Sequence, residues 1–124
     1  MPEKVLIIDD SLTNNVLLES LLQSEGIDST VAYSGKEALD ILKKEPPSLI
    51  LLDIMMPDMD GFMVIDRLNK NEATKNIPVI MITAKDDSES IVKAKNAGVK
   101  DFITKPIDLN KVMESVKKHL TTYR

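Results

Sequence analysis

The chain has 124 residues, of which 43% are hydrophobic and 3% aromatic, so it is long enough for a core that aliphatic side chains and methionines must fill. A net charge of −4 argues against a nucleic-acid-binding surface, and the absence of cysteine excludes disulfides, zinc–thiolate sites and a thiol nucleophile. No apolar run reaches the length of a membrane span or a signal-peptide core. We therefore expect a single domain over residues 1–124, located in the cytoplasm and not bound to a membrane.

Five short apolar segments have the length and composition of β-strands. The third segment is an unbroken run of leucine and isoleucine that ends at Asp53, which is typical of a parallel strand buried on both faces. The second segment is more polar, which suits a strand at the edge of a sheet. The predicted strands cover residues 5–8, 29–33, 49–53, 79–83 and 101–104.

Between the strands, apolar residues recur at the spacing of amphipathic helices. The first helix is expected to begin after Asp10 or Ser11 and to end at Gly26. Its expected apolar face consists of Val16, Leu17, Leu18, Leu21 and Leu22. Residues that can cap a helix also precede the second, fourth and fifth helices, at Ser34, at 86–89 and at Asp108.

Strand and helix alternate five times, and each connection is long enough for a right-handed βαβ crossover. We therefore predict an α/β fold of the doubly wound, flavodoxin-like (βα)5 type. Its five-stranded parallel sheet has the order 2-1-3-4-5, with helices on both faces. In this topology the strand order reverses between strands one and three, and ligands bind at the carboxyl ends of the strands.

Polar residues stand at four of these strand ends: Asp9 and Asp10, then Asp53, Thr83 and Lys105. Three carboxylates in one cleft repel each other unless a cation holds them. An all-oxygen ligand set without histidine or cysteine suits Mg²⁺, with Mn²⁺ as a substitute. Together with an ammonium and a hydroxyl group, these residues suit phosphoryl transfer in which a carboxylate acts as the nucleophile.

At these residues the chain resembles the receiver domain of two-component response regulators, the CheY-like family, over nearly its whole length. Each matching motif alone is weak, but their order along the chain and their positions at strand ends are highly specific. The motifs are Asp9-Asp10, Asp53 with the MPDMDG segment at 56–61, Thr83-Ala84 and Lys105-Pro106.

The resemblance implies that Asp53 is the phosphoacceptor, which takes a phosphoryl group from a phosphohistidine of a histidine kinase or a histidine phosphotransfer protein. It implies that Asp10, Asp53 and the backbone carbonyl of Met55 ligate Mg²⁺, while Asp9 acts through a bound water. Lys105 is expected to pair with the phosphoryl oxygens. The Lys105–Pro106 peptide bond is expected to be cis, as in the family, which places the ammonium group in the cleft.

The resemblance also implies a switch. Thr83 would move to hydrogen-bond a phosphoryl oxygen, and Phe102, at the position of the family's switch aromatic, would turn inward with it. The surface of helix four, strand five and helix five would then report the change to a downstream target or output domain. The chain would act as a signalling switch and not as an enzyme, since it promotes only its own phosphorylation and dephosphorylation. It would be a monomer or a dimer formed on phosphorylation.

Three other functions compete with this interpretation. A Mg²⁺-dependent phosphatase of the haloacid-dehalogenase type needs a second aspartate two residues after its nucleophile, where this chain has Ser11 or Met55. A flavin-binding module needs a phosphate-cradling loop after strand one, where Asp9 and Asp10 would repel a phosphate. A receiver that signals without phosphorylation finds no support, because all five key residues are present.

Overall fold

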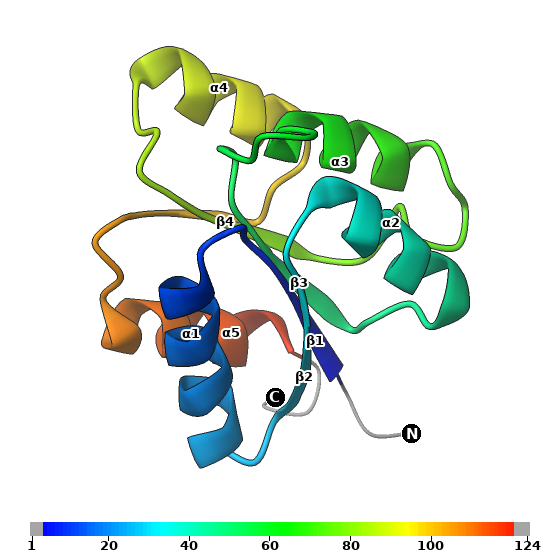
Figure 1. The fold of residues 1–124 in the computed structure, drawn as a ribbon. Helices are drawn as coiled ribbons and strands as arrows, with labels where there is room; N and C mark the ends of the chain where they lie inside the picture. Colours follow the sequence, from blue (N-terminus) through cyan, green and yellow to red (C-terminus); the bar gives the residue numbers. More distant parts are fainter. Residues whose placement is uncertain (1–3, 121–124) are drawn as a thin grey trace.

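Strands and helices alternate along the chain in the computed structural model, which describes residues 4–120 (Figure 1). The first three and last four positions of the predicted domain over 1–124 lie outside the described residues. The strands are β1 (Lys4–Ile8), β2 (Asp28–Ala32), β3 (Leu49–Leu52), β4 (Val79–Thr83) and β5 (Asp101–Thr104). The helices are α1 (Leu12–Ser24), α2 (Gly35–Lys44), α3 (Gly61–Asn69), α4 (Ser88–Asn96) and α5 (Leu109–His119).

The strands form one parallel sheet of order β2-β1-β3-β4-β5, which confirms the predicted order. β3 lies at the centre and is buried along its whole length, as its unbroken apolar run predicts. β2 is an edge strand and is only partly buried, which also agrees with its sequence. The pairs Ile8↔Leu52 and Thr83↔Thr104 are in register, so the carboxyl ends of neighbouring strands lie side by side.

Helices cover both faces of the sheet, and each face has its own hydrophobic core (Figure 1). Because successive side chains of a strand point to opposite faces, consecutive residues of one strand enter different cores. Under α2, α3 and α4 the strands contribute Leu6, Ile8, Ala32, Ile50, Leu52, Val79 and Met81. Under α1 and α5 they contribute Val5, Ile7, Leu49, Leu51, Ile80, Ile82 and Ile103.

A serine or aspartate stands directly before each helix and accepts a hydrogen bond from a backbone N–H of the first turn, which that turn would otherwise leave unpaired. The helices α1 and α4 are each followed by a glycine with positive φ, Gly26 at +72° and Gly98 at +90°, where a side chain would be strained. The capping residues are Ser11, Ser34, Asp60, Asp87 and Asp108.

The predicted apolar face of α1 is wrong in part. Leu18 and Leu22 are buried in the core between α1 and the sheet, but Val16 is 51% and Leu17 38% exposed. The buried stripe instead includes Asn15, one turn before Leu18. Five nearly contiguous apolar residues span more of the helix surface than the sheet can cover, so part of that surface stays in solvent. Within residues 4–120, no helix has the length and apolarity needed to cross a membrane.

Candidate phosphorylation site

Four strands deliver the predicted site residues to one edge of the sheet (Figure 1). Asp9 and Asp10 follow β1, Asp53 follows β3, Thr83 ends β4 and Lys105 follows β5. The backbone N–H of Lys105 donates to the carbonyl of Thr83 at 2.9 Å, so the two strand ends stay paired up to the site. The cleft at the carboxyl ends is therefore a direct consequence of the parallel topology.

Asp9 is almost fully buried and is held at both carboxylate oxygens. The backbone N–H of Ser11 donates to Oδ1 at 2.9 Å, and Lys105 Nζ donates to Oδ2 at 2.9 Å. Burial disfavours the charged form and raises the pKa of Asp9, because it outweighs these hydrogen bonds. A buried carboxylate at a strand end is costly unless it is paired, so its position here points to a role in binding cations.

Asp53 is 5% exposed and shares the same ammonium group. Its Oδ2 lies 3.1 Å from Lys105 Nζ, and its Oδ1 accepts a hydrogen bond from the backbone N–H of Met55 at 3.3 Å. Burial alone would lower the pKa of Lys105, but the hydrogen bond that Lys105 donates to Asp9 and the charges of both carboxylates raise it above the usual lysine value. Lys105 therefore stays charged at physiological pH. The Lys105–Pro106 bond is cis, as predicted.

Asp10 completes an acidic cluster with Asp9 and Asp53. One carboxylate oxygen from each residue lies within 4.8 Å of the other two, and Asp10 is exposed while the other two are buried. The set contains only oxygen donors and opens to solvent on one side, which fits an ion that keeps several waters. The residues present therefore fit Mg²⁺, as the sequence predicts. Lys105 offsets part of the negative charge through its ion pairs with Asp9 and Asp53.

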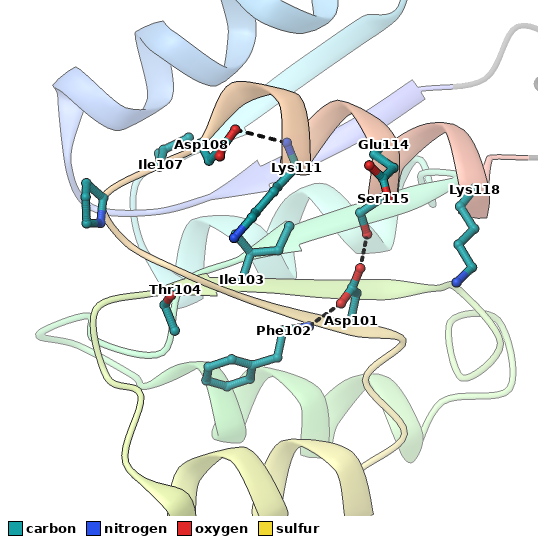
Figure 2. Close-up of a pocket in the computed structure, with 11 residues that line it drawn as sticks. Asp101, Phe102, Ile103, Thr104, Ile107, Asp108, Lys111, Glu114, Ser115 and Lys118 are labelled. Carbon is teal, nitrogen blue, oxygen red and sulfur yellow. Dashed lines mark hydrogen bonds between the residues drawn. The ribbon is translucent and has the colours of Figure 1, made fainter.

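Thr83 is fully buried, and its Oγ1 accepts a hydrogen bond from the backbone N–H of Lys85 at 3.2 Å. On the neighbouring strand, Phe102 is in register with Met81 and packs against the core under α4. Because side chains alternate along a strand, Thr83 points to the same face as Met81 and therefore as Phe102. Figure 2 shows the Phe102 ring on the side of the sheet opposite α5. The two predicted switch residues thus lie on the same face of the sheet.

Two contacts near the site do not follow from the sequence patterns, those of Asn15 and of Asp58. Asn15 is buried in α1, where its Nδ2 donates to the backbone carbonyl of Asp9 at 2.7 Å. An asparagine three residues before Leu18, in line with the buried stripe, is the signal that could have identified it. Asp58 accepts hydrogen bonds from the first amides of α2, and no local pattern indicates a partner so distant along the chain.

Comparison with known proteins agrees with this geometry. A family model described as the response regulator receiver domain matches residues 5–117. The chain belongs to the response regulator receiver family. The receiver is 38% identical over 120 residues to sporulation initiation phosphotransferase F of Bacillus subtilis, a match that covers 97% of this chain and 95% of that one. It is 41% identical over 108 residues to response regulator PleD of Caulobacter vibrioides, which covers 87% of the receiver but only 24% of PleD.

Solved structures give the same result. A CheY-like response regulator receiver domain protein from Methanospirillum hungatei matches the receiver with a TM-score of 0.91 and 28% identity, covering 99% of this chain and 97% of that one. Chemotaxis protein CheY4 of Vibrio cholerae matches with a TM-score of 0.90 and 27% identity, covering 97% and 100%. The predicted family and fold are therefore confirmed, and the chain is a receiver of two-component signalling.

Proposed function

We propose that the receiver accepts a phosphoryl group on Asp53 from a phosphohistidine of a histidine kinase or histidine phosphotransfer protein. The observation that carries the proposal is the convergence of Lys105, Asp9 and Asp10 on one buried strand-end carboxylate. In the reaction, an Asp53 oxygen bonds to phosphorus while the P–N bond breaks. The electron pair of that bond leaves with the donor imidazole, and Asp53 becomes an acyl phosphate.

The charged Lys105 ammonium would offset the negative charge that spreads over the phosphoryl oxygens in the transition state. Asp10, Asp53 and the Met55 carbonyl would hold Mg²⁺ directly, with Asp9 acting through a water, and Mn²⁺ would serve as a substitute. When bound, the ion supplies further positive charge at the same oxygens. The all-oxygen donors and the exposed Asp10 support this assignment.

The donor would dock on the first turns of α1. Leu12, Val16 and Leu17 are all exposed there, and Leu12 begins the helix two residues after Asp10. Exposed apolar side chains that lie together beside a reactive group are typical of an interaction surface. A donor histidine carried on a partner's apolar face would reach Asp53 from this side.

Phosphorylation would switch the surface formed by α4, β5 and α5. The phosphoryl group adds charge and acceptor oxygens, which Thr83 and Lys105 can contact in only one arrangement of their loops. A movement of Thr83 would reach α4 through Phe102, which shares its face of the sheet. Ile91 and Val92 on α4 are exposed and available to a downstream target or output domain.

The β5 and α5 part of this surface is hollowed. A groove of about 800 Å³ runs between the two elements (Figure 2). Within it Ser115 Oγ donates to Asp101 Oδ2 at 2.6 Å, and the backbone N–H of Phe102 donates to Asp101 Oδ1 at 2.9 Å. Lys111 and Lys118 line the same groove and give it a mixed charge. A partner that enters it would meet both polar and apolar side chains.

The experiment that tests the proposal is incubation with acetyl phosphate and Mg²⁺, followed by intact mass. We expect a gain of one phosphoryl group, which is lost in Asp53→Asn and in EDTA. Beryllofluoride, which mimics the phosphoryl group, should bind the wild type and not the variant, and size-exclusion chromatography with it separates a monomer from a phosphorylation-dependent dimer. Absence of both mass gain and beryllofluoride binding would refute the proposal. We further propose that residues 1–124 form one domain and that the receiver is located in the cytoplasm.

A further inference from the structure

The loop that follows the acceptor, residues 53–61, is closed at its base by a glycine. The backbone N–H of Gly61 donates to the carbonyl of Ile54 at 2.8 Å. A Cβ added to Gly61 would lie 2.6 Å from the carbonyl oxygen of Asp53, closer than a side chain can approach backbone. The end of the loop therefore rests directly on the backbone of the acceptor residue.

The tip of the same loop is fastened to another element, the N-terminus of α2. Asp58 Oδ1 accepts a hydrogen bond from the backbone N–H of Gly35 at 3.2 Å, and Oδ2 accepts one from Lys36 at 3.0 Å. The local cap, Ser34 Oγ, pairs only with the N–H of Glu37, at 3.1 Å. Asp58 thus satisfies the first two amides of α2, which Ser34 does not serve, and its negative charge suits the positive end of the helix.

The contact between loop and helix is also tight. A Cβ added to Gly35 would lie 2.8 Å from the Met59 Cβ, so these two segments fit together only because Gly35 has no side chain. The hydrogen bonds that Asp58 accepts from the backbone N–H groups of Lys36 and Gly35 hold the pKa of Asp58 below its usual value, and the carboxylate remains charged at neutral pH. The loop tip and the first turn of α2 therefore behave as one unit.

Met55 lies between these two attachments. Its N–H contacts Asp53 Oδ1 at 3.3 Å, while its side chain is 57% exposed. Its own side chain adds little support, but its neighbours Ile54 and Met56 are buried in the core, so the Met55 backbone is held by these two residues together with the two ends of the loop. Loss of either end would remove part of this support, and the Met55 carbonyl could then shift relative to Asp53.

We propose that Asp58 is a positioning residue for phosphoryl transfer: by anchoring the 53–61 loop to α2, it fixes the Met55 backbone beside Asp53 and thereby sets the affinity for Mg²⁺. The inference rests on the proposed function, in which Asp53 is the acceptor and the Met55 carbonyl is a metal ligand. It extends that function to a residue outside the acidic cluster and to the edge of the fold where α2 begins.

The test compares Asp58→Ala with Ser34→Ala, a matched control that removes a cap of the same helix and leaves the loop anchor intact. The Mg²⁺ dissociation constant is measured by calorimetry without any phosphodonor, and the rate with acetyl phosphate is measured across Mg²⁺ concentrations. We expect Asp58→Ala to weaken Mg²⁺ binding about tenfold, as for other groups that orient metal ligands. Its rate should return close to that of the wild type at saturating Mg²⁺, whereas Ser34→Ala should keep the wild-type affinity.

Asp58→Asn provides a second variant that retains one acceptor oxygen and should fall between Asp58→Ala and the wild type. It also carries the test if Asp58→Ala does not fold. If the folded Asp58 variants bind Mg²⁺ as tightly as Ser34→Ala does, the inference is wrong. A wild type that neither binds Mg²⁺ nor gains a phosphoryl group would instead refute the proposed function.

Discussion

Replacing Lys105 by methionine should destabilise the metal-free protein strongly, although the side chain is close in size. The ammonium lies 2.9 Å from Asp9 and 3.1 Å from Asp53, and both carboxylates are buried. At an effective dielectric constant of about 20, each pair attracts by roughly 5 kcal/mol before the desolvation of the charges is subtracted. Removing one partner of a buried pair typically costs about 3–5 kcal/mol, and since the Lys105 side chain is 16% exposed we expect about 3 kcal/mol.

A loss of this size lowers the melting temperature of a 124-residue chain by roughly 10 °C. Urea unfolding in EDTA and in Mg²⁺ measures the effect directly. Because Mg²⁺ would replace the missing positive charge, the difference between wild type and variant should shrink when the ion is added. The control is Lys70→Met, which breaks an exposed pair with Asp66 and should change stability by less than about 0.5 kcal/mol in either condition. A difference for Lys105→Met that Mg²⁺ leaves unchanged would refute the reasoning.

Three further predictions test other parts of the structure. Hydrogen bonds with Ser90 lower the pKa of Asp87 to about 2, so the charged carboxylate stabilises the fold above the usual aspartate pKa, and this stabilisation is lost as pH falls through the lowered pKa. Thermal melts between about pH 5 and about pH 2 should therefore show the difference in melting temperature between wild type and Asp87→Asn disappearing toward the lower pH. Gly61→Ala and Gly26→Ala should each cost about 1 kcal/mol or more in chemical unfolding, but calorimetry should find weakened Mg²⁺ binding only for Gly61→Ala. Leu18→Ala should lower the free energy of unfolding, measured in urea, by about 3 kcal/mol, because Leu18 is fully buried. Leu17→Ala should change the free energy of unfolding little, because Leu17 is exposed. It should slow phosphoryl transfer from a protein donor but not from acetyl phosphate. Equal slowing with both donors would contradict the proposed docking on α1.

The arrangement of the acidic cluster could be predicted from the sequence because a parallel sheet converts strand order into spatial proximity. Asp9, Asp10 and Asp53 each follow an apolar run, and the alternation of strand and helix places those runs side by side. Lys105 could be placed for the same reason. Apolar periodicity and a capping residue before a helix involve only neighbouring residues, so they can also be predicted from the sequence.

Other features depend on packing that no local pattern records. The apolar residues of α1 span a wide arc, and the contacts of the helix with α5 and the sheet decide that Leu18 is buried while Val16 is exposed. The partners of Asp58 lie 22 and 23 residues away, so an aspartate in a turn-forming segment gives no sign of them. The burial of Asn15 cannot be read from the sequence because asparagine is usually exposed, and its buried position follows only from the orientation of the helix.

The contact of Asp101 with its own strand bears on how the molecule behaves at high concentration. β5 is the last strand of the sheet, and an unpaired strand edge invites pairing with another chain and aggregation. Here the N–H of Phe102 is already occupied by the Asp101 carboxylate, which Ser115 holds in place. A negative charge at this position also repels an approaching backbone carbonyl. The open edge is thereby protected against sheet extension, so partners must recognise its side chains and cannot simply add a strand.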